Sequence, residues 1–215
     1  MAGFFAASFS QMAAAEPVEV VTLGDSLTAG YGLAPQDGFA AQLQTWLDAN
    51  GYDARLVNAS VSGDTTAGGA ARLDWVLQET TDAVIVQLGA NDFLRGLDPG
   101  QARGNLTKIM EEISARGLPV LLVGLPAPGN YGADYKADFD SIYPDLAEAY
   151  GAILYADLFA PLRELGLERM DEVMQSDGLH PNAAGVARVV EGIGPAVGAL
   201  ITTSASSSSA QANPE

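Results

Sequence analysis

The sequence predicts a single α/β domain in which a five-stranded parallel sheet is covered by helices on both faces. Short apolar segments rich in β-branched residues alternate along the chain with longer segments of helical spacing. The short segments are apolar almost throughout, as strands buried on both faces are. The 215 residues include 48% hydrophobic residues, 24 glycines and 11 prolines, which fits one domain with a sizeable core and many tight turns. No internal repeat or linker divides the chain.

The strands are expected where the apolar runs stand between turn residues. The first run ends at a glycine, Gly24, and the third is the most strongly apolar. The five expected strands cover residues 18–23, 54–58, 83–88, 119–125 and 152–155.

The expected helices show apolar residues at intervals of three and four. The first has Phe39, Leu43 and Leu47 on one face, and Gly51 follows it as a stop signal. The third begins on a proline, which is favoured at the first helical position, and the last has Asn182 as its N-cap. The five expected helices cover residues 39–50, 66–78, 99–116, 135–150 and 182–201. Trp46 and Trp75 lie on their apolar faces and are expected in the core.

The two ends of the chain differ from the domain between them, residues 16–201. Residues 1–15 are small and apolar, and Ala13–Ala15 fit the cleavage pattern of a secretory signal, but no Lys or Arg precedes Arg55. The segment is therefore interpreted as a signal peptide, which implies a periplasmic or secreted protein, or as an N-terminal extension of a cytoplasmic one. Residues 202–215 are rich in Ser and Ala and are expected to form a disordered tail.

The excess of acidic over basic residues disfavours some classes of binding partner. There are 27 acidic and 10 basic residues, a net charge of −17. Binding to nucleic acid or to an anionic membrane surface requires a basic patch, so both are disfavoured. The acidity is consistent with a self-repelling soluble surface and also with a saline habitat. The chain has no cysteine, which removes disulfides, thiolate catalysis and Cys-based zinc sites.

A serine stands at the end of the first expected strand. Ser26 lies two residues after Gly24, and the carboxyl ends of strands are where open α/β sheets present reacting groups. A serine is a poor nucleophile unless a base takes its proton. The only histidine of the chain is His180, and Asp177 precedes it by three residues. One loop could thus present a carboxylate to one ring nitrogen while the other faces Ser26, although the same spacing is common in ordinary surface loops.

Two further loops follow later strands and carry potential oxyanion donors. Gly63 lies in the loop after the second strand, and Asn91 in the loop after the third. A backbone amide and a side-chain amide at neighbouring strand ends could both donate to a developing oxyanion. Taken singly, Gly63 is also explained by a turn, and Asn91 with Asp92 by capping of the next segment. Asp25, Asp64 and Asp92 are interpreted as residues that fix loops.

Together, these four segments resemble the SGNH hydrolases of the GDSL family. The matching blocks are Gly-Asp-Ser-Leu at 24–27, Ser-Gly-Asp-Thr-Thr at 62–66, Gly-Ala-Asn-Asp at 89–92 and Asp-Gly-Leu-His-Pro at 177–181, in the family's order. Segments near 91–97, 125–132 and 142–146 are similar to the thioesterase I, lysophospholipase L1 and arylesterase branch. The likeness covers roughly residues 18–200.

The resemblance implies a flavodoxin-like three-layer sandwich and a serine esterase or thioesterase that needs no metal or cofactor. It implies Ser26 as nucleophile, His180 as base and Asp177 as the residue that orients it. Its oxyanion hole would comprise the amides of Ser26 and Gly63 and the side chain of Asn91. The substrate would be a small acyl ester or thioester cleaved through an acyl-enzyme, and the protein a monomer or weak dimer without stable membrane insertion.

The acyl pocket is expected beside these motifs. Residues 93–97 are apolar except for Arg95, which fits either a flap over the acyl pocket or a loop packed on the core. Residues 126–135 carry two tyrosines and are expected to form another wall of the cleft. The candidate pocket residues are Phe93, Leu94, Leu97, Tyr131 and Leu179.

Two other functions and one other fold were weighed against this interpretation. A carbohydrate O-acetyl esterase of the same family would accept only short acyl groups, and a non-catalytic binding protein would not need the triad. An α/β-hydrolase requires Gly-x-Ser-x-Gly, but position 28 is Thr.

Overall fold

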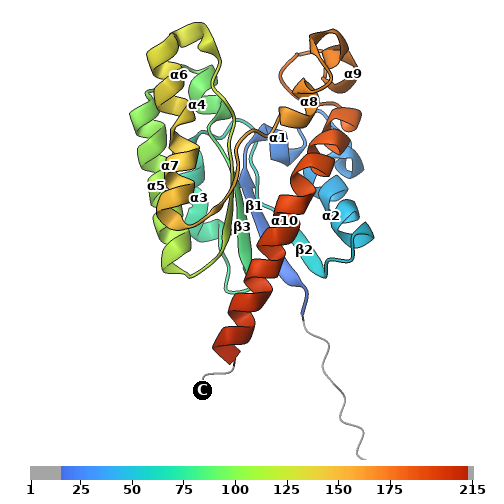
Figure 1. Cartoon of the computed structure of the whole chain (residues 1–215), viewed down its shortest axis with the longest axis vertical. Helices are drawn as coiled ribbons and strands as arrows, with labels where there is room; N and C mark the ends of the chain where they lie inside the picture. Colours follow the sequence, from blue (N-terminus) through green and yellow to red (C-terminus); the bar gives the residue numbers. More distant parts are fainter. Residues whose placement is uncertain (1–15, 213–215) are drawn as a thin grey trace, which may run out of the picture.

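The structure is a computed structural model that describes residues 16–212, with side chains placed up to residue 206 (Figure 1). Five parallel strands form one sheet in the order β2-β1-β3-β4-β5, which confirms the predicted fold class. The proposed signal segment, residues 1–15, lies outside the described residues. The strands are β1 (Val18–Gly24), β2 (Ala54–Asn58), β3 (Ala83–Gln87), β4 (Val120–Val123) and β5 (Ile153–Tyr155).

Two layers of helices cover the sheet (Figure 1). Helices α3, α5, α6 and α7 lie on one face, and α2, α8 and α10 lie on the other. The longer helices are α2 (Phe39–Ala49), α3 (Thr66–Val76), α5 (Pro99–Ala115), α6 (Ala133–Asp140), α7 (Ile142–Tyr150) and α10 (Ala183–Ala212). The short ones are α1 (Ser26–Ala29), α4 (Ala90–Leu94), α8 (Ala160–Arg163), α9 (Met170–Val173) and the 3₁₀ turns η1 (Pro35–Asp37), η2 (Gly129–Tyr131) and η3 (Leu167–Arg169).

The strand order places a topological switch point between β1 and β3. The chain leaves β1 for β2 on one side and then crosses back to β3 on the other, where Gly24 pairs with Gln87. In open α/β sheets, ligands bind at the carboxyl ends of the strands that flank such a point. Ser26 follows β1 directly and α4 follows β3, so the fold brings the first and third motif blocks to the same edge.

The core lies between the sheet and each helical layer. β3 is buried along its whole length, and α2 and α5 contribute fully buried side chains from opposite faces. Each such Leu or Ile contributes roughly 1.5–3 kcal/mol relative to its exposed state. The central side chains are Leu43, Leu47, Ile85, Leu106, Ile109 and Ile113.

Helix α10 differs from its prediction at its C-terminal end. It extends to Ala212, so residues 202–212 are helical and the expectation of a disordered tail from 202 is wrong for them. This end of the helix is tied to the fold at Ser204, which is buried and donates through Oγ to the carbonyl of Asp82 at 2.9 Å. The hydroxyls of Thr202 and Thr203 are satisfied by carbonyls four residues back. Its segment Ala183–Ser206 is long and apolar enough to span a bilayer, but 56% of its most apolar window is buried in the fold, as in a core helix.

The expected helix 135–150 is also corrected. It is two helices, α6 and α7, separated at Ser141. Pro144 explains the break, because a proline has no amide to donate to the carbonyl four residues back and its ring crowds that carbonyl.

The two tryptophans differ in their surroundings. Trp46 packs on the core and stacks with Tyr52 at 6.1 Å between ring centroids. Trp75 is 85% exposed, so its predicted core position is wrong. It lies in α3, where Leu73 supplies the buried contact and Trp75 faces solvent.

Candidate active site

Ser26 is placed by a helix N-terminus immediately after β1. Asp25 is the N-cap of α1, and its Oδ1 accepts a hydrogen bond from the amide of Leu27 at 3.0 Å. Gly30 ends this single turn with a φ of 84°, a left-handed conformation that favours glycine. Asp25 therefore fixes the backbone on both sides of Ser26, as the sequence predicted for a loop-fixing carboxylate.

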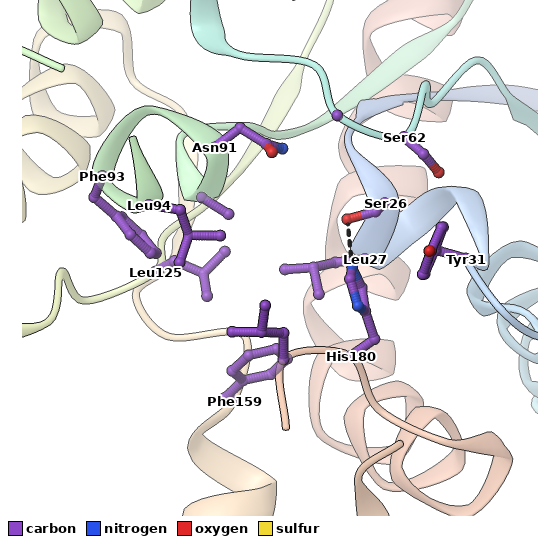
Figure 2. Close-up of a pocket in the computed structure, with 13 residues that line it drawn as sticks. Ser26, Leu27, Tyr31, Ser62, Asn91, Phe93, Leu94, Leu125, Phe159 and His180 are labelled. Carbon is purple, nitrogen blue, oxygen red and sulfur yellow. Dashed lines mark hydrogen bonds between the residues drawn. The ribbon is translucent and has the colours of Figure 1, made fainter. Parts of the chain in front are cut away.

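The three residues of the expected triad lie in one line of hydrogen bonds, of which Figure 2 shows the one between Ser26 and His180. His180 Nε2 lies 2.8 Å from Ser26 Oγ, across 154 residues of sequence. His180 Nδ1 lies 2.7 Å from Asp177 Oδ2. Asp177 Oδ1 accepts from the amides of Leu179 and His180 at 2.9 and 3.0 Å. The hydrogen bond from His180, followed by those from the two amides, lowers the pKa of Asp177 to about 2, so this carboxylate is ionised at neutral pH.

The loop that carries His180 is held from both ends. The backbone amide of Gln175 donates to the carbonyl of His180 at 2.8 Å. Asn182 caps α10, because its side-chain oxygen accepts from the backbone amides of Ala184 and Gly185. The ring of Tyr31 lies 4.6 Å from the imidazole of His180, between centroids, and packs against it. Tyr31 thus limits the orientation of the imidazole.

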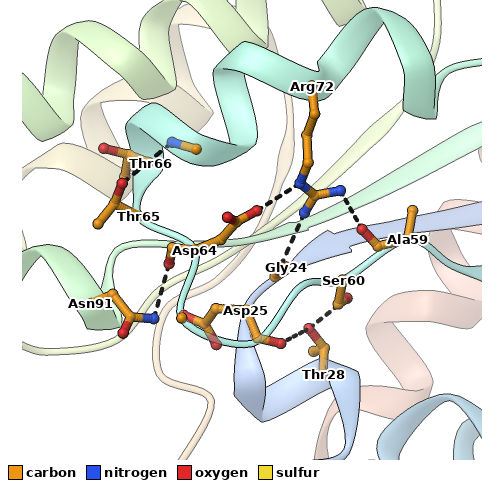
Figure 3. A network of polar contacts seen from close by, with 12 residues as sticks. Gly24, Asp25, Thr28, Ala59, Ser60, Asp64, Thr65, Thr66, Arg72 and Asn91 are labelled. Carbon is orange, nitrogen blue, oxygen red and sulfur yellow. Dashed lines mark hydrogen bonds and ion pairs between the residues drawn. The ribbon is translucent and has the colours of Figure 1, made fainter.

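The second and third blocks meet on the other side of Ser26. Asn91 is in α4, and its Nδ2 donates to the carbonyl of Asp64 at 2.9 Å (Figure 3). Gly63, with a φ of 88°, lies one residue earlier in the same loop. Gly63 and Asn91 line the pocket that contains Ser26. Both residues expected as oxyanion donors therefore lie in the same pocket as Ser26, and their role as donors stays a prediction.

Arg72 ties the loops around the site to each other (Figure 3). Its guanidinium pairs with the carboxylate of Asp64 at 2.6 Å and donates to the carbonyls of Ala59 and Gly24. The last of these carbonyls belongs to the end of β1, so one side chain connects the loops after β1 and β2. Sequence reasoning did not single out Arg72, because nothing near it in the sequence marks a donor that spans two strand ends.

Asp92 fixes the start of α3 against α4. Its Oδ2 accepts from the amide of Thr66 at 2.8 Å and its Oδ1 from the Thr66 hydroxyl at 2.6 Å. Burial raises the pKa of the Asp92 carboxyl, an effect that the two hydrogen bonds oppose. Burial also raises the pKa of Asp25, to about 6. Neither carboxylate lies in the Ser26–His180–Asp177 line, which agrees with the predicted structural roles.

A pocket of about 400 Å³ opens beside Ser26, a size typical of small-molecule sites (Figure 2). Of the five predicted lining residues, Phe93, Leu94 and Leu179 line it, whereas Leu97 and Tyr131 do not, so those two predictions are wrong. The carbonyl of Leu97 accepts a hydrogen bond from Tyr135, and Tyr131 packs over Gly96, outside the pocket.

Sequence reasoning missed half of the apolar wall. Leu27 follows the nucleophile directly, which was a usable signal. Phe159 lies in the loop after β5. Because loops at the carboxyl edge of a parallel sheet surround the binding site, its position was a second usable signal. The lining residues that were not predicted as part of the site are Leu27, Tyr31, Ser62, Ala90, Leu125 and Phe159.

The GDSL-like Lipase/Acylhydrolase family model matches residues 22–188, which include Ser26, Gly63, Asn91 and His180. The chain belongs to this family. Among residues 16–212, no three His, Cys, Asp or Glu side chains are gathered so that they could hold a metal ion.

Relatives of this GDSL-like chain include proteins named as esterases and thioesterases. It is 40% identical to the esterase TesA of Pseudomonas aeruginosa over 193 residues, 89% of this chain and 92% of the relative. It is 36% identical to the thioesterase 1/protease 1/lysophospholipase L1 of Escherichia coli over 167 residues, 76% of this chain and 75% of the relative. The crystal structure of AlinE4, an SGNH-hydrolase family esterase, superposes with a TM-score of 0.70 at 43% identity, covering 86% of this chain and 97% of AlinE4. The chain is a serine ester hydrolase of the GDSL-like family.

Proposed function

We propose that Ser26 is the nucleophile, His180 the general base and Asp177 the residue that orients the imidazole. The observation that carries this assignment is the continuous Ser26–His180–Asp177 hydrogen bonding, at 2.8 and 2.7 Å. Ser26 Oγ attacks the acyl carbonyl while its proton passes to His180 Nε2. The bond to the leaving alkoxide or thiolate then breaks, and that group takes the proton. A water molecule hydrolyses the acyl-enzyme by the same steps, with His180 again as base.

The developing oxyanion is stabilised by three donors in this proposal. They are the amides of Ser26 and Gly63 and the Nδ2 of Asn91. The hydrogen bond from Asn91 to the carbonyl of Asp64 uses one of its two N–H groups and leaves the second for the substrate. Fixed donors of this kind stabilise charge that exists only in the transition state.

The wall of the pocket indicates the acyl side of the substrate. Six apolar side chains surround the space next to Ser26, which suits a hydrocarbon chain rather than a sugar. They are Leu27, Phe93, Leu94, Leu125, Phe159 and Leu179. We therefore assign a broad activity on carboxylic esters and thioesters with acyl chains longer than acetyl, including aryl esters, acyl-CoA thioesters and lysophospholipids.

A chain-length series tests this assignment against its alternatives. p-Nitrophenyl acetate, butyrate, octanoate and palmitate are compared with octanoyl-CoA and a lysophospholipid. Octanoate is expected to be cleaved at least as fast as acetate. Cleavage of acetyl esters alone would favour the carbohydrate O-acetyl esterase, and no cleavage of any substrate by a protein with the intact triad would favour a binding protein.

The controls use two serines of the same pocket. Ser62 lines the pocket but makes no hydrogen bond to His180, so Ser62→Ala is expected to keep most of the activity. Ser26→Ala is expected to lose it.

We propose further that the protein is exported after cleavage behind Ala15, and that it acts as a monomer or weak dimer without stable membrane insertion. The small apolar residues 1–15 and the Ala13–Ala15 sequence support export. Intact-mass measurement of protein from the native host tests this, since a chain that retains residue 1 would contradict it.

A further inference from the structure

Two side chains of α4 hold neighbouring carbonyls of the same loop. Asn91 Nδ2 donates to the carbonyl of Asp64 at 2.9 Å, and Arg95 Nη2 donates to the carbonyl of Gly63 at 2.8 Å. Residues four apart lie on the same face of a helix, and Arg95 is the C-cap of α4. The helix thus contacts the loop between β2 and α3 at two consecutive residues.

Apolar packing does not fix the loop at this point. Its turn is closed by the hydrogen bond from the amide of Asp64 to the carbonyl of Val61 at 3.1 Å, and the amide of Val61 donates to the carbonyl of Gly24 at 3.0 Å. Val61, Ser62 and Gly63 are all exposed, so the apolar core does not hold them. Gly63 has a φ of 88°, and, apart from its neighbours Ser62 and Asp64, Nη2 of Arg95 is the only heavy atom of the described residues within 4 Å of the position where its Cβ would be, at 3.9 Å. A glycine in an exposed loop has many accessible conformations. Its orientation therefore depends on the hydrogen bonds made by its own peptide groups.

The far end of α4 is anchored independently of that loop. Tyr135 Oη donates to the carbonyl of Leu97 at 2.8 Å, and Tyr131 packs against Gly96. Asp92, in the same helix, holds Thr66 through two hydrogen bonds. Arg95 consequently reaches the loop from a fixed base.

Arg95 donates to this carbonyl and forms no ion pair with an acidic side chain of residues 16–206, although its charge opposes the rise that burial causes in the pKa of Asp92. The ion pairs found among residues 16–206 involve seven other basic side chains and His180, but not Arg95. A hydrogen bond from a charged donor is stronger than one between neutral groups. It therefore favours the conformation of this exposed loop in which the carbonyl of Gly63 faces Arg95.

We propose that Arg95 is a positioning residue for the oxyanion hole, which holds Gly63 so that its amide points into the pocket at the reacting carbonyl. This inference rests on the proposed function, in which Gly63 is an oxyanion donor. Arg95 acts through Gly63 and does not touch the substrate. Its loss lets the Gly63 amide leave its position without disturbing the triad or the acyl pocket.

The test compares Arg95→Ala and Arg95→Lys with Arg188→Ala, which removes an arginine from α10, next to a separate surface hollow. Displacement of a catalytic group by about 1 Å can cost up to about 10² in rate. For p-nitrophenyl octanoate, Arg95→Ala is expected to lower kcat by about 10–50-fold with KM changed by less than about twofold. Arg95→Lys retains a charged donor for the single hydrogen bond and is expected to restore kcat to within about threefold of the wild type. Arg188→Ala is expected to match the wild type.

A second measurement separates positioning of the hole from a general structural effect. An alkyl boronic acid forms a tetrahedral adduct on a serine with an oxygen in the oxyanion hole, whereas n-octane has no oxygen to place there and contacts the acyl pocket alone. In Arg95→Ala the inhibition constant of the boronic acid is expected to rise in parallel with the fall in kcat, with the affinity for n-octane and the melting temperature unchanged.

Three results would overturn the inference. The first is an unchanged kcat in Arg95→Ala while the wild type is active. The second is a loss confined to substrates with anionic leaving groups such as acyl-CoA, which would make Arg95 a substrate contact. The third is an equal weakening of boronic acid and n-octane binding. An inactive wild type, in contrast, would contradict the proposed function and this inference with it.

Discussion

The carboxylate of Asp25 is hydrogen-bonded through Oδ1 to the amide of Leu27 at 3.0 Å, and so caps the helix that begins at Ser26. The same side chain is fully buried, and among the described residues its Oδ2 makes no hydrogen bond of good geometry, although the side chain of Gln87 interacts with the carboxylate and partly offsets the effect of burial on its pKa. Burial raises its pKa from 3.8 to about 6. Asp25, beside the nucleophile, therefore stabilises α1 as its N-cap, while the burial of its ionised carboxylate destabilises the fold at neutral pH.

We predict that Asp25→Asn changes stability in a pH-dependent way. Because the carboxyl has a higher pKa in the folded than in the unfolded chain, the folded state binds more protons between pH 4 and 6. The free energy of unfolding contributed by this group therefore falls as pH rises from about 4 to about 6. Asn keeps an oxygen to accept from Leu27 without the charge, so the variant is expected to be more stable at pH 7.5, by up to about 3 kcal/mol.

Urea unfolding of both proteins at pH 4 and at pH 7.5 measures this difference. The gain from Asp25→Asn should largely disappear at pH 4, where the wild-type carboxyl is protonated. A stability difference that is the same at both pH values would show that the buried charge is not its cause.

We predict that Asn91→Ala lowers kcat by about 10²–10³, the usual cost of one oxyanion donor. KM for octanoyl esters should change little, because Asn91 contributes an amide rather than apolar area to the pocket. Stopped-flow measurement of the acylation step checks this, with circular dichroism as the control for folding. A rate within a few-fold of the wild type would remove Asn91 from the oxyanion hole.

We predict that Asp177→Asn lowers kcat by about 10⁴ and leaves the fold intact. Asn preserves an acceptor for the amides of Leu179 and His180, but its NH₂ group favours the wrong tautomer of the imidazole. The side chain is 36% exposed, so its replacement leaves no buried cavity. Steady-state kinetics and a melting curve measure the two effects, and activity within tenfold of the wild type would exclude Asp177 as the orienting residue.

We predict that Gly89→Ala destabilises the protein by about 2–4 kcal/mol. Gly89 has a φ of 122°, and a Cβ there would lie 2.3 Å from Oη of Tyr143, which donates to the carbonyl of Leu88. Backbone strain and overpacking each cost about 1–3 kcal/mol.

Gly104→Ala is the matched control for this substitution. Gly104 lies in α5 with open space at its Cβ position, so alanine there should stabilise by about 0.5–1 kcal/mol. Equal effects of the two substitutions in denaturant titrations would contradict the argument from φ and crowding.

The sequence predicted the sheet well, because its strands are buried on both faces and their apolar runs end at turn residues. It also predicted which residues meet at the site, since Ser26, Gly63 and Asn91 follow three strands whose carboxyl ends share an edge. In a parallel sheet the carboxyl ends of all strands share one edge, so residues that follow different strands in the sequence can be predicted to lie at the same edge.

What the sequence did not reveal depends on side chains that reach across the fold. Arg72 connects two loops from α3, Tyr31 packs on His180, and Phe159 enters the pocket from the loop after β5. No local pattern marks such contacts. Leu97 was misplaced for the opposite reason, because it continues an apolar run whose earlier members do line the pocket.

Reaction with a fluorophosphonate, followed by intact-mass and peptide analysis, tests the central claim most directly. Such probes modify a serine whose hydroxyl is activated by a neighbouring base. We expect one adduct per chain, on Ser26, with normal labelling of Ser62→Ala and none of Ser26→Ala or His180→Ala. An adduct on another serine, or an unlabelled wild-type protein, would contradict the assignment of Ser26 as the nucleophile activated by His180.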